Sequence, residues 1–142
     1  MSELSNLYQQ TILRHNKSPY HYGRPETSDV VLEAYNPLCG DKYKIYLDVV
    51  EDRIDKAYFF GYGCAISKAS TSVLVQRLEG KKLSAILELC QHFLESLVRE
   101  NADIAEDEEL AAFSAARQFP GRLKCASLSW DSLIEYLEIS EE

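Results

Sequence analysis

The chain has 142 residues, of which 46% are hydrophobic and 27% charged, so one globular domain spanning residues 1–142 is expected. Its formal net charge of −8 argues against nucleic-acid binding, which depends on Lys and Arg neutralising phosphates. No stretch approaches the ~18 uninterrupted apolar residues of a membrane span, and the start lacks a secretion signal, so a cytoplasmic protein without membrane contact is expected.

The first half of the chain predicts one helix followed by a small sheet. Apolar residues recur at spacings of three and four over residues 2–17, which indicates an amphipathic helix that Pro19 ends. From Asp41 to Val49 apolar and polar residues alternate strictly, as in a half-buried antiparallel strand. Together with the neighbouring runs, this pattern predicts a three-stranded meander at residues 30–35, 41–49 and 54–60.

The second half predicts helices. Apolar residues at helical spacing cover residues 66–78, with Gly80 as a stop, and a longer run covers about 84–100. An acidic segment at 103–109 opens a short helix through Ala116, because acidic side chains suit a helix start, and the last helix begins near Cys125. The expected fold class is therefore α+β, with helices packed on one face of a small three-stranded antiparallel sheet.

Three of the four cysteines lie in separate contexts, each where a turn is expected to meet a regular element: Cys39 in Leu38-Cys39-Gly40-Asp41, Cys64 after Gly61-Tyr62-Gly63, and Cys125 after Arg122-Leu123-Lys124. In the cytosol, cysteines are more often reduced, ligating or catalytic than paired as disulfides. The alternative is that they are small buried hydrophobes. That alternative is preferred for the fourth, Cys90, which falls on the apolar face of the long helix.

The pattern favours a zinc site formed by Cys39, Asp41, Cys64 and Cys125. Cys39 and Asp41 are two residues apart, so on an extended chain they point to the same side, and Gly40 lets the backbone bend between them. Cys64 and Cys125 are each expected near a helix N-terminus, where the dipole favours thiolate over thiol. Zinc prefers four ligands of these types in a tetrahedron.

Four anionic ligands exceed the charge of one zinc ion, so the site needs nearby cations. Arg122 and Lys124 fit that need by their proximity to Cys125, although plain solvated charge is an equal interpretation. The acidic run 106–109 is interpreted as a solvated helix start. The three histidines are interpreted as ordinary residues and not as ligands: His15, His21 and His92.

These residues carry a resemblance to the IscU/NifU-like iron–sulfur assembly proteins. The blocks around Cys39, Cys64 and Cys125 resemble the three signature blocks of that family, and the pattern from Ile12 to Gly23 also matches. The chain is most similar to the SufU branch, because Lys124 precedes the third cysteine where the IscU branch has His. The acidic segment around 101–118 also resembles an insertion typical of SufU.

The resemblance implies an IscU/SufU-like fold and a zinc-dependent sulfurtransferase that accepts persulfide sulfur from a SufS-type cysteine desulfurase. It implies that Cys39 is the persulfide acceptor, while Asp41, Cys64 and Cys125 retain Zn2+ as a desulfurase histidine replaces Cys39. Downstream iron–sulfur assembly proteins are the other implied partners. Two alternatives stay open: a scaffold on which a [2Fe–2S] cluster is built with the same four residues, and a structural zinc domain used for docking. Lys124 favours the transferase over the scaffold.

Overall fold

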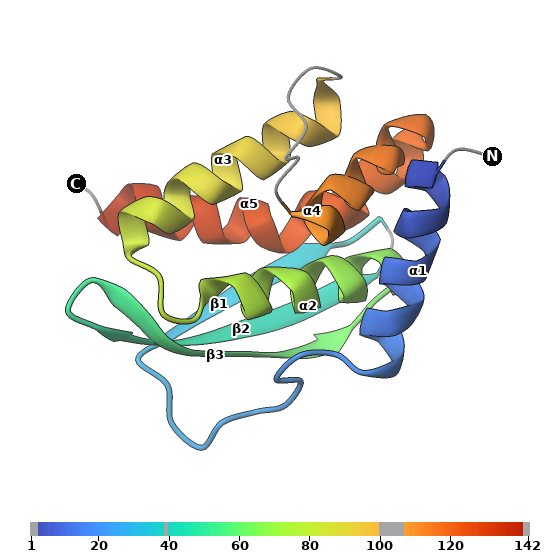
Figure 1. Ribbon diagram of the computed structural model, residues 1–142. Helices are drawn as coiled ribbons and strands as arrows, with labels where there is room; N and C mark the ends of the chain where they lie inside the picture. Colours follow the sequence, from blue (N-terminus) through green and yellow to red (C-terminus); the bar gives the residue numbers. More distant parts are fainter. Residues whose placement is uncertain (1–2, 39, 100–106, 141–142) are drawn as a thin grey trace.

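A computed structural model describes residues 3–38, 40–99 and 107–140 of the chain (Figure 1). In chain order its elements are α1 (Glu3–Lys17), β1 (Val30–Asn36), β2 (Asp41–Val50), β3 (Arg53–Tyr62), α2 (Ala65–Leu78), α3 (Leu83–Val98), α4 (Glu108–Ala112), 3-10 helices at Phe113–Gln118 and Pro120–Arg122, and α5 (Leu123–Ser140). The three-stranded sheet and the helices confirm the α+β class that the sequence predicts.

The sheet is an antiparallel meander in the order β1-β2-β3. Along β2 the alternation appears directly as burial, since Tyr43, Ile45 and Leu47 are fully buried while Lys42 and Lys44 are exposed. The buried face is covered by α2 and α5, with α3 packed outside α5 (Figure 1). Among the described residues, no helix covers the opposite face. The helices therefore pack on one side of the sheet, as predicted.

Helix α2 lies at the centre of the helical layer and is buried on most of its circumference. Its small polar residues let α5 approach closely, and each of them is hydrogen bonded. The Ser70 hydroxyl donates to the carbonyl of Ala126 at 2.5 Å and accepts from the indole N–H of Trp130 at 2.9 Å. The Thr71 and Ser129 hydroxyls are 2.7 Å apart. These bonds fix α2, which Cys64 caps, against α5, which holds Cys125 in its first turn.

The structure differs from the prediction after residue 107. The expected helix through Ala116 is a short α4 followed by a 3-10 helix, Phe113–Gln118, in which Phe113 to Ala116 are buried. A tighter 3-10 turn commonly finishes an α-helix, and Pro120, at the start of the next turn, cannot continue one. That second turn, Pro120–Arg122, leads straight into α5, so α5 begins at Leu123 and holds Cys125 inside its first turn.

The described part of the acidic run, Asp107 to Glu109 at the start of α4, is not simply a solvated helix start, which corrects the sequence interpretation. Arg77 of α2 binds Asp107 through two nitrogens at 2.8 and 3.0 Å and Glu109 at 2.8 Å. Glu109 also accepts a hydrogen bond from His15 of α1 at 2.8 Å. These contacts join α4 to α1 and α2. In the ranges that the structure describes, no helix has the combined length and apolarity needed to cross a membrane.

Candidate metal centre

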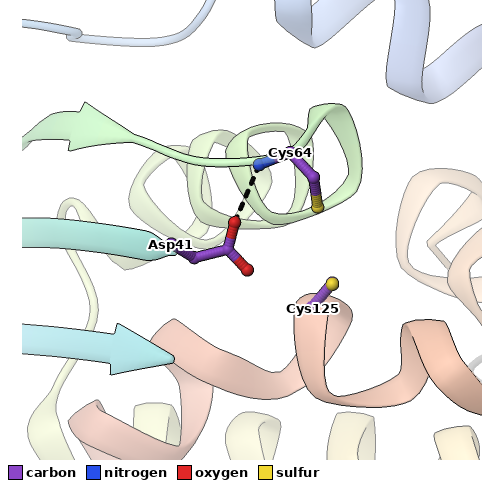
Figure 2. Close-up of side chains that lie close together, drawn as sticks. All are labelled: Asp41, Cys64 and Cys125. Atoms are coloured by element: carbon purple, nitrogen blue, oxygen red, sulfur yellow. Dashed lines mark hydrogen bonds between the residues drawn. The ribbon is translucent and has the colours of Figure 1, made fainter. Parts of the chain in front are cut away.

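Three of the four predicted ligands come together at one end of the sheet (Figure 2). Asp41 begins β2, Cys64 caps the N-terminus of α2, and Cys125 lies in the first turn of α5. One ligand atom from each residue lies within 4.8 Å of the other two. Cys39, the fourth predicted ligand and the predicted persulfide acceptor, lies outside the described residues.

The chain on either side of residue 39 forms a turn between β1 and β2. The backbone N–H of Gly40 donates to the carbonyl of Asn36 at 2.9 Å, and Gly40 has φ +74°, a conformation that residues with a Cβ rarely adopt. Leu38 is 94% exposed. Leu38 is therefore open to solvent at the end of the sheet where Asp41 lies.

The two carboxylate oxygens of Asp41 have different surroundings. Asp41 is fully buried, and its Oδ1 accepts a hydrogen bond from the backbone N–H of Cys64 at 2.8 Å (Figure 2). Its Oδ2 is buried without a hydrogen-bond partner. A buried carboxylate oxygen without a partner is costly. A cation between this oxygen and the two sulfurs removes that cost.

The N-terminus of α2 stabilises negative charge on Cys64. Its sulfur accepts a hydrogen bond from the backbone N–H of Ser67 at 3.4 Å and lies 3.6 Å from the Ser67 hydroxyl. Unpaired N–H groups and the helix dipole at such an end favour anions. The ammonium group of Lys124 binds Asp131 at 3.2 Å, and both side chains are about half exposed, so its role as a compensating cation stays a prediction. Backbone donors at the start of α2 compensate part of the negative charge.

Two neighbours that were not among the predicted site residues fix this geometry, Ser67 and Tyr43. The Tyr43 hydroxyl lies 3.0 Å from the Ser67 hydroxyl, and burial raises the pKa of Tyr43 above its ordinary value. Both hydroxyls surround Gly63. A Cβ at Gly63 would lie 2.4 Å from Asp41 Oδ1 and 2.6 Å from the Ser67 hydroxyl oxygen. Only glycine lets the chain pass between them. The spacing of Cys64 and Ser67, three residues apart at the start of a predicted helix, is the sequence feature that could have indicated this capping contact.

Tyr8 of α1 contributes a further buried hydroxyl. The side chain is almost fully buried between two rings, at 5.8 Å and 87° from Phe113 and at 6.5 Å and 12° from Phe119. Its hydroxyl has no hydrogen-bond partner in the described structure. Burial raises the pKa of Tyr8 to about 12, with smaller contributions from the negative charge of Cys64 and the opposing positive charge of Arg122. The hydroxyl therefore stays protonated and can act as a donor.

The donor set fits zinc. On one tetrahedral zinc ion two sulfurs are about 3.8 Å apart, and a sulfur and an oxygen are somewhat closer. The ligand atoms lie within 4.8 Å of one another, which exceeds these spacings by up to about 1.3 Å, a distance on the scale of a side-chain rotation. Thiolates with one carboxylate are ligands that zinc accepts and that magnesium or calcium do not select.

The other cysteine and the histidines lie outside this group. Cys90 is fully buried in the core, as predicted, and burial raises its pKa to about 12. The ring nitrogens of His15 contact the Ser72 hydroxyl at 2.6 Å and Glu109 at 2.8 Å. Nδ1 of His21 lies 3.1 Å from Glu79. These interactions occupy His15 and His21 away from the three converging residues.

Known proteins are similar to this chain in sequence and in fold. The chain is 34% identical over 133 residues to the zinc-dependent sulfurtransferase SufU of Bacillus subtilis, covering 93% of this chain and 90% of that protein. It is 33% identical over 141 residues to the iron–sulfur cluster assembly scaffold protein IscU of Streptococcus pyogenes, covering 99% and 88%.

Solved structures agree with these relatives. A crystal structure described as that of an iron–sulfur cluster assembly scaffold protein for the SUF system of Fervidobacterium islandicum superposes with a TM-score of 0.78 at 30% identity, covering 90% of this chain and 94% of that chain. The sequence profile described as the NifU-like N terminal domain matches residues 7–126, a range that includes Asp41, Cys64 and Cys125. This chain therefore belongs to the NifU-like N-terminal domain family.

Proposed function

We propose that this protein works in iron–sulfur cluster biogenesis as a zinc-dependent sulfurtransferase that accepts sulfur from a SufS-type cysteine desulfurase. The observation that carries the proposal is the buried oxygen of Asp41, which has no hydrogen-bond partner and lies in one group with the sulfurs of Cys64 and Cys125. Similarity to the SufU protein of Bacillus subtilis supports the choice of zinc and of sulfur transfer.

Asp41, Cys64 and Cys125 would hold the ion together with Cys39. When bound, zinc keeps its thiol ligands deprotonated at neutral pH. The protein contributes the rest: the N-terminal N–H groups of α2 stabilise the Cys64 sulfur, and the N–H of Cys64 orients Asp41. With three ligands anchored on regular elements, Cys39 is the ligand that can leave without dismantling the site.

The transfer itself is a thiol exchange. The Cys39 thiolate attacks the terminal sulfur of the persulfide on the desulfurase cysteine, a new S–S bond forms, and the S–S bond of the donor breaks. The donor cysteine leaves as a thiolate, and the transferred sulfur keeps its proton, so Cys39 becomes the persulfide. No electron is gained or lost overall. The neighbouring Leu38 is exposed, which is consistent with a partner reaching this turn.

The decisive experiment is the Cys39→Ala substitution in a desulfurase assay. We expect the variant to fold and to lose stimulation of the desulfurase, because the acceptor thiol is absent. Cys90→Ala is the matched control, since that thiol is buried in the core and should leave stimulation unchanged. Full stimulation by the Cys39→Ala variant would remove Cys39 from the mechanism and refute the proposal.

The second candidate is a scaffold for a [2Fe–2S] cluster, favoured by the similarity to the IscU protein of Streptococcus pyogenes. The same donor residues suit an iron–sulfur cluster. The two candidates differ in what anaerobically purified protein contains. About one zinc per chain and no colour support the transferase, whereas brown protein with iron and sulfide supports the scaffold.

A further inference from the structure

The face of the sheet that no described helix covers carries an unusual set of side chains where it approaches the metal centre. Strand pairing places Tyr35, Lys42 and Tyr62 side by side in one row across the three strands. Lys42 directly follows Asp41, and Tyr62 precedes Cys64 by two residues. The row is therefore the edge of this face nearest the converging ligands.

The next row extends this surface. It places Lys44 beside Phe60, and the guanidinium of Arg24 lies over the Phe60 ring at 4.4 Å from its centroid. An open pocket of about 330 Å³ is lined by residues that include Arg24, Lys42, Lys44, Phe60 and Tyr62. We refer to six residues as the basic–aromatic face: Arg24, Tyr35, Lys42, Lys44, Phe60 and Tyr62.

One ring of this surface, Phe60, is held in place by neighbouring contacts. The Tyr22 ring packs against Phe60 with centroids 5.0 Å apart, and its hydroxyl donates to the carbonyl of Gly61 at 2.5 Å. The Lys68 ammonium lies 4.8 Å from the centroid of the Tyr22 ring. A ring that is already ordered loses little conformational freedom when a partner binds, so Phe60 suits an interface.

The charge of this surface opposes that of the chain. The protein carries a net charge of −8, whereas the basic–aromatic face contributes three cations. Glu33 is the acidic residue that the strand register places in these two rows, and its carboxylate lies 3.9 Å from Lys44 with both side chains about half exposed. Such an exposed pair is weak, so it leaves the cations available. A partner with a complementary surface would therefore present acidic side chains to this face.

Two exposed tyrosines indicate that the partner is a protein. Tyr35 is 60% exposed and Tyr62 is 65% exposed. Tyrosine and arginine are enriched where proteins bind one another, around an apolar centre. The net charge of the whole chain repels nucleic acid and anionic lipid, which bind through long-range attraction to cations.

We propose that the basic–aromatic face is the docking surface for the sulfur donor, through carboxylates that surround an apolar centre on the desulfurase. The inference rests on the proposed function, because the donor persulfide must come within bonding distance of Cys39. A donor that close covers the residues bordering the site, and on the sheet side those residues are Lys42 and Tyr62. Opposite charge speeds and orients the encounter, and the tyrosines supply contact area.

The test measures the dissociation constant between this protein and a purified SufS-type cysteine desulfurase. The variant Lys42→Glu/Lys44→Glu should bind at least about tenfold more weakly at about 50 mM salt, and the loss should shrink at about 500 mM. Lys56→Glu/Lys82→Glu is the matched control, with the same change of charge at exposed sites outside the face. The affinity of this control variant for the desulfurase should stay within about twofold of that of the original protein, because its changed charges lie outside the face.

Tyr62→Ala tests the aromatic contribution and should weaken binding by at least about fivefold at both salt concentrations. Zinc content and the unfolding midpoint of each variant show whether the site and fold are intact. The docking proposal fails if the face variants bind as well as the control while the original protein still stimulates the desulfurase. It also fails if the face variants keep their affinity for the desulfurase and instead abolish a dimer of this protein that sedimentation detects. The same holds if they instead abolish the flotation of this protein with anionic vesicles. If the original protein neither binds nor stimulates the desulfurase, the proposed function fails with it.

Discussion

The carboxylate of Asp41 accepts a hydrogen bond from the backbone N–H of Cys64 at 2.8 Å through one oxygen, and its other oxygen is buried without a partner. Asp41→Asn keeps the size of the side chain and removes its charge. We expect zinc affinity to fall by at least about tenfold, because an anionic ligand becomes a neutral one. Competition with a chromophoric chelator measures this loss. Asp48→Asn, at the other end of β2, is the control, and equal affinities of the two variants would exclude ligation by Asp41.

A second prediction concerns the glycine between Asp41 and Ser67. A Cβ added at Gly63 would lie 2.4 Å from Asp41 Oδ1, closer than real Cβ atoms approach, so Gly63→Ala must move the carboxylate or the chain. We expect about 1–3 kcal/mol loss of stability together with weaker zinc retention. Gly23→Ala is the control, because a Cβ there meets no atom within 4 Å. Urea denaturation and metal analysis check both effects. A variant with unchanged zinc affinity would show that Asp41 does not need this exact position.

The sheet was predictable from sequence because the alternation along β2 is a local property. Side chains of a strand alternate between two faces, so Tyr43, Ile45 and Leu47 had to share the buried one. The α4 region was not predictable in the same way. Phe113 packs between Tyr8 and Phe93, residues that are distant in sequence, and tertiary packing of this kind overrides helix periodicity.

In the candidate site, too, local features were predictable from sequence and contacts between distant residues were not. Residue types and spacing pointed to Asp41, Cys64 and Cys125, which the fold does bring together. Side-chain partners were beyond sequence reasoning. Lys124 is adjacent to Cys125 in the chain, yet on a helix consecutive side chains point in different directions, and Lys124 binds Asp131.

A third prediction tests the contact that fixes α2 against α5. Ser70→Ala leaves the buried indole N–H of Trp130 without its acceptor and removes the hydrogen bond to the carbonyl of Ala126. We expect a loss of about 1–3 kcal/mol in the free energy of unfolding, because a buried donor is left unsatisfied. Ser84→Ala, at an exposed position of α3, should change it by less than about 0.5 kcal/mol. Indole fluorescence during urea denaturation follows both. If the Ser70→Ala and Ser84→Ala variants were equally stable, water or another group would have to replace the Ser70 hydroxyl as the acceptor for Trp130.

A fourth prediction separates Cys90 from the other thiols by reactivity. Burial raises its pKa to about 12, and its side chain is inaccessible, so almost no thiolate is available at pH 8. We expect iodoacetamide to label Cys90 only after the protein unfolds. Peptide mass spectrometry of protein treated with and without denaturant gives the labelled fraction at each cysteine. Labelling of Cys90 at the rate of an exposed thiol would contradict its place in the core.

A fifth prediction uses the ion pairs that attach α4 to α2. Burial raises the pKa values of Asp107 and Glu109, but the hydrogen bonds and positive charge of Arg77 outweigh it and lower both. A carboxyl group whose pKa is lower in the folded state stabilises the fold above its unfolded pKa and ceases to do so as the pH falls. Stability from this cluster should therefore be complete near neutral pH and decline below about pH 5.

Arg77→Met removes the cation and keeps an apolar side chain of similar length. At pH 7 we expect the variant to be about 1–3 kcal/mol less stable, because Asp107 and Glu109 both lose the ion pair with Arg77. The difference should shrink as both carboxyl groups become protonated in acid, since neutral acids need no cation. Groups that do not contact this cluster are common to both proteins and cancel in the comparison. Arg99→Met, which breaks an exposed pair with Glu95, should cost less than about 0.5 kcal/mol at any pH. Urea denaturation from pH 3.5 to 7 measures the difference, and a gap that stays constant with pH would show that Arg77 acts through packing and not through charge.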